Sequence, residues 1–390
     1  MTKKSDAPAI RFKGFSDAWE QRKLGELVDR VVRKNTNNES TLPLTISAQY
    51  GLVDQITYFN NRVASRDVSN YYLVLNGEFA YNKSTSDGYP FGAVKRLDLY
   101  EKGVLSTLYI VFAPKKEQQI DSDYLTVFFD TDRWHKGVAE RAAEGARNHG
   151  LLNISAEDFF DIDLSVPKDI VEQKQIGAFI RQLDNLITLH QRKFEKLTNV
   201  KKSMLEKMFP QNGSSYPEIR FKGFTDPWEQ RKLGDLLQTL PFKQFLKEPE
   251  PDGKYEIIQQ GNEPVIGFAN GTPCGDYKDV VIFGDHTLSL YKPQHPFFVA
   301  TDGVRIVKGQ QDTDGYYLLS LLERYKPQSE GYKRYYSILA DTNCITTYNT
   351  SEQEKIGVFF KLLDNLITLH QRELEKLQNI KKSMLEKMFV

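Results

Sequence analysis

Three polar loops carry side chains that could bind a charged partner, and they lie at 82–92, 140–153 and 330–337. Each combines basic side chains with glycines, which let a partner approach the backbone closely. Arginine and asparagine can read base edges, whereas lysine suits phosphate. The alternative is that these are solvated surface loops whose arginines pair with nearby acids such as Glu144 and Glu330. The candidate nucleic-acid-binding residues are Lys83, Ser84, Thr85, Tyr89, Arg147, Asn148, Lys333, Arg334 and Tyr335.

No catalytic signature accompanies these loops in the sequence. There is no G-x-x-x-x-G-K-[ST] phosphate loop, no Asn/Asp-Pro-Pro-aromatic tetrapeptide and no Ser–His or Cys–His motif. A faint nuclease-like pattern, Pro251-Asp252 followed by Glu256, has Ile258 where a lysine would be expected. The sequence therefore favours a binding protein over an enzyme.

The composition indicates a folded protein without excess charge. The 390 residues are 40% hydrophobic, and 52 basic residues balance 52 acidic ones, which counts against a protein that coats nucleic acid by bulk charge. Cys274 and Cys344 form no C-x-x-C pair, so we expect no metal site and a reducing, cytoplasmic setting. No signal segment and no apolar run of ~18 residues is present, so no membrane association is expected.

The polar loops belong to a chain that contains an internal repeat. The short segment 10–25, IRFKGFSDAWEQRKLG, returns at 219–234 as IRFKGFTDPWEQRKLG. The longer segment 172–209 returns at 352–389 with the shared core LDNLITLHQR. The segments between these repeats differ in sequence and length. A constant scaffold with two divergent inserts suggests that the inserts select what the protein binds, and that the scaffold holds the inserts in place.

The longer repeats are predicted to be helices of about 55 Å with one apolar stripe. Asp169 with Glu172, and Ser351 with Glu354, resemble capping pairs at their starts. The two stripes either cover their own neighbouring blocks or pack on each other, antiparallel if a pseudo-twofold axis relates the halves. The residues expected to mediate helix–helix packing are Leu183, Ile187, His190, Leu197, Leu363, Ile367, His370 and Leu377.

The two histidines interrupt the stripe at the middle of each helix. His190 and His370 are either partly exposed polar residues flanking the seam or a facing pair that fixes its register. The blocks outside the helices contain short strand-like runs such as YYLVL and DVVIFGD, separated by turn residues. The predicted fold class is therefore α+β: two β-rich domains separated by a pair of long antiparallel helices, in a pseudo-twofold internal repeat.

At this point the chain resembles a known family. The motif W-E-Q-R-K-L-G-[ED]-L, a variable block and then L-D-x-L-I-T-L-H-Q-R with K-K-S-M-L-E-K-M-F resemble the specificity (S) subunit of type I restriction-modification systems. NKSTSDGYPFGAVKRL and FGDHTLSLYKP also look like stretches of that family's target recognition domains. The implied domains are signature repeat one (1–25), target recognition domain 1 (26–168), spacer helix 1 (169–209), a linker with signature repeat two (210–236), target recognition domain 2 (237–349) and spacer helix 2 (350–390).

The resemblance implies a non-catalytic subunit of a restriction endonuclease and adenine-N6 methyltransferase complex. Each target recognition domain would read one half of a bipartite, asymmetric site in double-stranded DNA, and the helices would fix the gap between the half-sites. The partners would be two modification (methyltransferase) subunits and motor/nuclease restriction subunits. S-adenosylmethionine, ATP and Mg²⁺ would bind to those partners, and this chain would carry no cofactor. The second block is shorter than the first, which leaves its recognition surface less well defined.

Two other classes of function remain open from the residues. A structural adaptor would carry two protein-binding domains on a coiled-coil strut. A nuclease or methyltransferase would act in its own right. Sequence-specific DNA binding together with methyltransferase subunits would favour the specificity subunit, and catalysis by the isolated chain would favour the enzyme.

Overall fold

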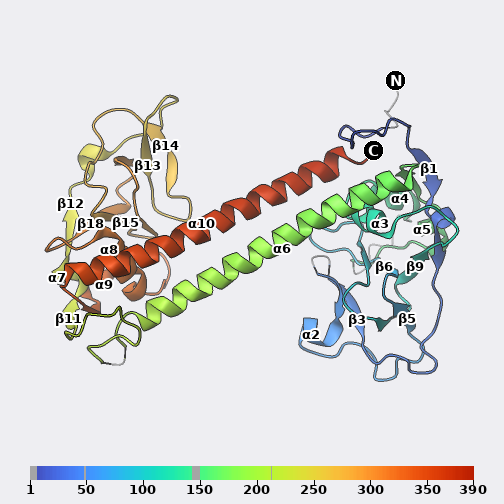
Figure 1. Ribbon diagram of the computed structural model, residues 1–390, viewed down its shortest axis with the longest axis horizontal. Coiled ribbons are helices and arrows are strands. Elements are labelled where there is room, and N and C mark those ends of the chain that lie inside the picture. Colours follow the sequence, from blue (N-terminus) through green and yellow to red (C-terminus); the bar gives the residue numbers. More distant parts are fainter. Residues whose placement is uncertain (1–6, 48–49, 143–149, 212) are drawn as a thin grey trace. The chain divides into compact units, whose positions relative to one another are not determined.

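The structure is a computed structural model that describes residues 7–47, 50–142, 150–211 and 213–390 (Figure 1). The chain divides into two compact units. Unit 1 comprises Met1–Leu189 and Leu374–Val390, and unit 2 comprises His190–Glu373. Both units therefore contain part of each long helix.

Unit 1 is built around a four-stranded antiparallel sheet of order β2-β9-β6-β7, with the two-stranded sheets β1-β10, β3-β4 and β5-β8. Its elements in chain order are β1 (Glu20–Lys23), α1 (Leu24–Leu27), β2 (Val28–Arg30), β3 (Leu44–Ser47), β4 (Gly51–Asp54), α2 (Gln55–Phe59), β5 (Tyr72–Leu75), β6 (Phe79–Asn82), β7 (Ala93–Arg96), β8 (Lys102–Leu105), β9 (Ile110–Pro114), α3 (Ser122–Phe129), α4 (His135–Arg141), α5 (Ala156–Phe160), β10 (Asp163–Val166) and the first part of α6 (Ile170–Lys207).

Unit 2 repeats this plan with a four-stranded sheet of order β12-β18-β15-β16 and a pair β11-β19, and it adds a three-stranded sheet β14-β13-β17. Its elements are β11 (Glu229–Lys232), α7 (Leu233–Leu236), β12 (Leu237–Leu240), η2 (Lys243–Phe245), β13 (Tyr255–Ile258), β14 (Val265–Ala269), β15 (Val280–Gly284), β16 (Leu290–Tyr291), β17 (Phe297–Val299), β18 (Val304–Gly309), α8 (Gly315–Tyr325), α9 (Tyr336–Asp341), β19 (Asn343–Thr346) and the first part of α10 (Thr350–Lys387).

The strands form where the sequence supplies short apolar runs bounded by turn residues. All five residues of β15, VVIFG, are buried, as expected of a central strand covered on both faces. The helix α8 packs against β15, β16 and β18 and buries Tyr317, Leu318 and Leu322. In unit 1 the strands β6 and β9 hold the sheet positions that β15 and β18 hold in unit 2. The rings of Phe79 on β6 and Phe112 on β9 stack there with centroids 5.3 Å apart.

A buried ion pair joins the short repeat to the start of the long helix in each unit. In unit 1, Nη2 of Arg11 lies 2.7 Å from Glu172, whose side chain is 1% exposed. In unit 2, Nε of Arg220 lies 2.7 Å from Glu352, which is equally buried. Each arginine makes two hydrogen bonds to its carboxylate, which fixes both distance and orientation.

The start of each long helix is capped by the residue just before it. The Oδ1 of Asp169 accepts a hydrogen bond from the backbone of Val171, 2.7 Å away, as the sequence indicated for the first helix. The expectation for the second helix was wrong by two residues. Asn349, rather than Ser351, accepts from the backbone of Glu352 at 3.1 Å, because α10 already begins at Thr350.

The long helices, each of 38 residues, pack against each other in an antiparallel arrangement inside both units. In unit 1, Lys381 of α10 lies 2.6 Å from Asp184 of α6. In unit 2, Lys201 of α6 lies 2.6 Å from Asp364 of α10. The two ion pairs occupy repeat-equivalent positions, since 180 residues separate the lysines and also the aspartates. The α+β fold class, with its repeat and its antiparallel helices, is therefore confirmed.

Each apolar stripe covers its neighbouring block and also packs on the other long helix, so both of the alternatives that the sequence left open occur. Leu183 is buried in the core of unit 1, where Leu377 also packs, and Leu363 packs on the core of unit 2. Ile187, Leu197 and Ile367 are half-buried. The two histidines form the facing pair, because Nδ1 of His190 lies 3.2 Å from Nδ1 of His370. Desolvation, with His190 and Lys193 nearby, lowers the pKa of His370.

We predict that Glu352→Ala destabilises unit 2 by about 3–5 kcal/mol, because it leaves the partly buried Arg220 without its carboxylate. The substitution also removes the acceptor of the Trp228 indole and of the Thr347 hydroxyl. Denaturant unfolding followed by tryptophan fluorescence measures the change. The control is Glu218→Ala, which breaks an exposed ion pair with Lys207 and is expected to change little. Equal effects of the two substitutions would contradict the prediction.

Candidate nucleic-acid interface

In unit 1, the connection between β6 and β7 lies against the segment at 150–154. The backbone of Thr85 donates to the carbonyl of Gly150 at 2.6 Å, and the backbone of Leu152 donates to that of Lys83 at 3.0 Å. The loop at 82–92 and the segment at 150–154, which are distant in sequence, therefore form one surface. Arg147 and Asn148 lie outside the described residues, and their role stays a prediction.

The candidate residues of the first loop differ in how free their side chains are. The ammonium group of Lys83 donates to the carbonyl of Ile154 at 3.4 Å, and the hydroxyl of Thr85 donates to that of Gly150 at 3.0 Å. Ser84 and Tyr89 are exposed, Tyr89 by 38%. In this conformation Ser84 and Tyr89 are the accessible members of the set, whereas Lys83 and Thr85 also hold the loop in place.

One glycine is required to close this loop. Gly92 has φ +75°, and a Cβ atom there would lie 2.1 Å from the carbonyl oxygen of Asn82. The hydroxyl of Tyr81, whose side chain is fully buried, donates to the carbonyl of Phe91 at 2.9 Å. The strand end and the last residues of the loop are thus held against each other, and residues 84–90 project between them.

In unit 2, the corresponding connection is the short turn between β15 and β16, at 285–289, and it lies against the loop at 329–335. Asp285, 1% exposed, joins the two segments. Its backbone carbonyl accepts from Tyr335 at 2.7 Å, and its Oδ1 accepts from the backbone of Tyr336 at 2.9 Å. Arg305 donates to the other carboxylate oxygen at 3.2 Å. Both units therefore place a hairpin connection beside the loop that precedes α5 or α9.

The candidates of the third loop occupy three different environments. Tyr335 is fully buried, and its hydroxyl donates to the carbonyl of Gly331 at 2.7 Å. Its ring and hydroxyl therefore shape the loop, and a direct contact of Tyr335 with DNA stays a prediction. Lys333 pairs with Glu330 at 2.6 Å. The alternative expectation was that an arginine of this loop pairs with Glu330, but the lysine makes this contact instead. Arg334 is exposed.

The turn at 285–289 in unit 2 is a part of this surface that the sequence did not predict. It contains His286, Thr287 and Ser289 and lies where the first loop lies in unit 1. A signal was present, since FGDHTLSLYKP and NKSTSDGYPFG were both noted as similar to recognition-domain stretches. Only their shared place in the sheet order shows that the two stretches are equivalent. Tyr332, in the neighbouring loop, was not predicted either.

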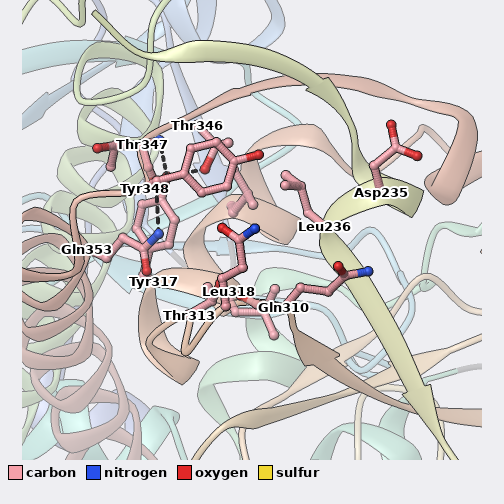
Figure 2. Close-up of a pocket in the computed structure, with 12 residues that line it drawn as sticks. Asp235, Leu236, Gln310, Thr313, Tyr317, Leu318, Thr346, Thr347, Tyr348 and Gln353 are labelled. Atoms are coloured by element: carbon pink, nitrogen blue, oxygen red, sulfur yellow. Dashed lines mark hydrogen bonds between the residues drawn. The ribbon is translucent and has the colours of Figure 1, made fainter. Parts of the chain in front are cut away.

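The polar cavity of Figure 2 is not part of this surface. It lies in unit 2 between α8 and the start of α10, and its lining includes Gln310, Tyr317, Thr347 and Gln353. Its volume is about 30 Å³, which accommodates roughly one water molecule and not a cofactor. The amide of Gln353 donates to the carbonyl of Thr347 at 2.6 Å across this region. The cavity is therefore a feature of the core.

Both cysteine thiols are buried in the core of unit 2. Burial raises the pKa of the Cys344 thiol to about 12, which disfavours the thiolate. Burial also raises the pKa of the other buried thiol, Cys274. Within the described ranges, no group of three or more His, Cys, Asp or Glu residues could hold a metal ion. Across the same ranges, no helix is both long and apolar enough to cross a bilayer.

Comparisons with known proteins point to one family. A family model described as the type I restriction modification DNA specificity domain matches residues 16–199. The second half of the chain repeats both signatures of that segment. The putative type I restriction enzyme MjaX specificity subunit of Methanocaldococcus jannaschii is 21% identical and covers 94% of this chain and 92% of its own length. Over nearly its whole length the chain is therefore similar to specificity subunits of type I restriction-modification systems.

Further relatives agree with this assignment. The MjaVIII specificity subunit of the same organism is 22% identical over 84% of this chain and 82% of its own length. The crystal structure of a type I restriction-modification S subunit from M. genitalium superposes with a TM-score of 0.66 at 16% identity and covers 98% of this chain and 99% of that one. This superposition shows that the fold is that of an S subunit. Unit 2 differs from unit 1 between β12 and β15, where η2, β13 and β14 stand in place of β3, β4, α2 and β5.

We predict that Gly92→Ala destabilises unit 1 more than Gly88→Ala does. Both glycines have φ +75°, so both substitutions carry the left-handed penalty of about 1–2 kcal/mol. Only Gly92 would also drive its Cβ into a backbone carbonyl, since nothing lies within 4 Å of a Cβ at Gly88. Thermal unfolding of the two variants makes the comparison. Equal losses of stability would mean that the loop does not depend on the close approach at Gly92.

Proposed function

We propose that this chain is the non-catalytic specificity subunit of a type I restriction-modification complex. Unit 1 carries a target recognition domain for one half of a bipartite, asymmetric site in double-stranded DNA, and unit 2 carries one for the other half. The observation that carries the proposal is the shared sheet order of the two units, in which near-identical signatures surround different loops. An asymmetric two-part DNA site requires two different recognition domains on one scaffold.

The chemistry of the loops supports DNA as the ligand. The exposed candidates are a serine and a tyrosine in unit 1 and Arg334 in unit 2, which can contact phosphates or base edges. The chain has no net charge, so the partner subunits supply much of the phosphate contact. The reading loops then contribute discrimination more than overall affinity.

The partners are two modification subunits and the motor/nuclease restriction subunits. S-adenosylmethionine, ATP and Mg²⁺ bind to those partners, which carry the adenine methylation and the DNA cleavage. The paired helices act as the spacer between half-sites. The complex forms in the cytoplasm, where its DNA substrate lies.

An exposed apolar stripe on α10 supports the recruitment of a protein partner. Val358, Leu362, Leu366 and Leu369 are 44–57% exposed, and their spacing of four, four and three places them on one helical face. Exposed apolar patches of this kind mark interaction sites. The first helix has leucines at the positions equivalent to the last two members of the stripe, namely Leu186 and Leu189, which are also exposed. Related stripes on both helices suit two copies of one partner.

We predict that the two recognition domains can be exchanged independently. Replacing residues 26–168 with the first block of another family member should change one half of the methylated site and leave the other unchanged. Methylome sequencing of cells that express the hybrid with its modification subunits reads both halves in one experiment. The unmodified chain provides the control. If both halves change together, the units do not read independently.

We also predict that the double substitution Leu362→Ser and Leu366→Ser weakens the binding of one modification subunit by tenfold or more, on the order of the loss of one buried leucine. Native mass spectrometry of the assembled complex should then show one modification subunit per chain in place of two. Ile338→Ser, at an apolar residue of α9 that is 38% exposed, is the matched control. Unchanged stoichiometry in the double variant would show that the stripe is not the docking face.

A further inference from the structure

An unusually exposed aromatic side chain stands beside the turn of unit 2. Tyr332 is 88% exposed, the highest value for a large apolar or aromatic side chain among the described residues. Its ring is nevertheless held in place, because it stacks on the imidazole of His286 with ring centroids 4.7 Å apart and an angle of 5° between the planes. The tyrosine contacts the imidazole, and almost all of its surface stays open.

The support under this stack is rigid. Nδ1 of His286 lies 3.1 Å from the carbonyl oxygen of Lys333, and the backbone of His286 donates to the side-chain carbonyl of Gln260 at 3.0 Å. The neighbouring Asp285 ties the turn to the loop through its carbonyl and its carboxylate. In the same turn Leu288 adopts φ +58°, a left-handed conformation that a leucine takes only where its surroundings impose it.

The loop that presents Tyr332 is equally constrained. The buried hydroxyl of Tyr335 accepts a hydrogen bond from the backbone of Glu330 at 2.6 Å and donates to Gly331 at 2.7 Å. Glu330 also pairs with Lys333, which offsets the negative charge closest to the tyrosine in sequence. The exposed Arg334 adds positive charge. The surroundings of the ring thus suit an anionic partner with flat faces.

We propose that Tyr332, held on His286, is a specificity-determining contact of unit 2 that stacks on a nucleobase or deoxyribose at a distorted step of its half-site. This inference rests on the proposed function. Folding gains little from an aromatic ring left in water, whereas a pre-ordered ring loses little entropy when it binds. Stacking on a base tolerates many sequences, so the discrimination arises from how easily the step unstacks. His286 is a positioning residue, because it acts through the tyrosine.

The test uses the complete chain assembled with its modification subunits and a duplex that carries the site identified by methylome sequencing. Tyr332→Ala should weaken equilibrium binding by about 5- to 150-fold, the range for loss of one stacked base. Tyr332→Phe should bind like the wild type, because the hydroxyl is not used. Tyr216→Ala, at a tyrosine that is 53% exposed elsewhere in unit 2, is the control and should change nothing.

The position of the contact can be read from the DNA. With 2-aminopurine placed in turn along both half-sites, wild-type binding should change its fluorescence at one step of the half-site read by unit 2. Tyr332→Ala should remove that signal and leave the other half-site unaffected. The role of His286 follows from a double-mutant cycle. His286→Ala should weaken binding less than Tyr332→Ala, and the double variant should be no weaker than Tyr332→Ala alone.

The outcomes separate this inference from the proposed function. If the wild-type complex shows no sequence-specific binding, the proposed function fails, and this inference fails with it. If the wild type binds specifically but Tyr332→Ala matches Tyr216→Ala, only the inference is overturned. If Tyr332→Ala weakens assembly with the modification subunits, while the variant complexes that do assemble bind DNA like the wild type, the tyrosine contacts a protein and the inference is overturned as well.

Discussion

The arrangement of each unit depends on one buried carboxylate. Glu172 and Glu352 are almost completely excluded from water, and each is compensated by a two-point contact with an arginine of the short signature. A buried charge is tolerated only with such a partner, so the signature must lie at the start of the long helix. The hydrogen bond to Glu172 also raises the pKa of Arg11. This explains why the short signature lies against the start of the long helix in each unit, and why these are the two segments that the sequence repeats.

The two copies of this network have diverged at its edge. In unit 2 the indole of Trp228 and the hydroxyl of Thr347 both donate to Glu352. In unit 1 the equivalent of the threonine is Pro167, which has no hydroxyl, and the indole of Trp19 is buried without a partner. The ion pair is kept while the surrounding hydrogen bonds vary, which indicates that the charge compensation positions the signature and that the additional bonds adjust stability.

The same separation between a constant support and a variable surface applies to the reading loops. In each unit the hydroxyl of a buried tyrosine donates a hydrogen bond to a backbone carbonyl of the loop and so supports it. The tyrosine is Tyr81 in unit 1 and Tyr335 in unit 2. Because the supporting hydrogen bonds use backbone carbonyls, the side chains above them can change without loss of the loop geometry.

The sequence by itself determined the repeat, the two long helices and the resemblance to type I specificity subunits, because repeated motifs and apolar periodicity are properties of neighbouring residues. It also located the loops at 82–92 and 330–337. Only the tertiary structure decided which side chains in them are free. Tyr335 and Tyr332 are three residues apart in one loop, yet the first is buried and the second is exposed. Their difference is set by Asp285 and His286, about 45–50 positions earlier in the chain, and such long-range partners leave no local pattern in the sequence.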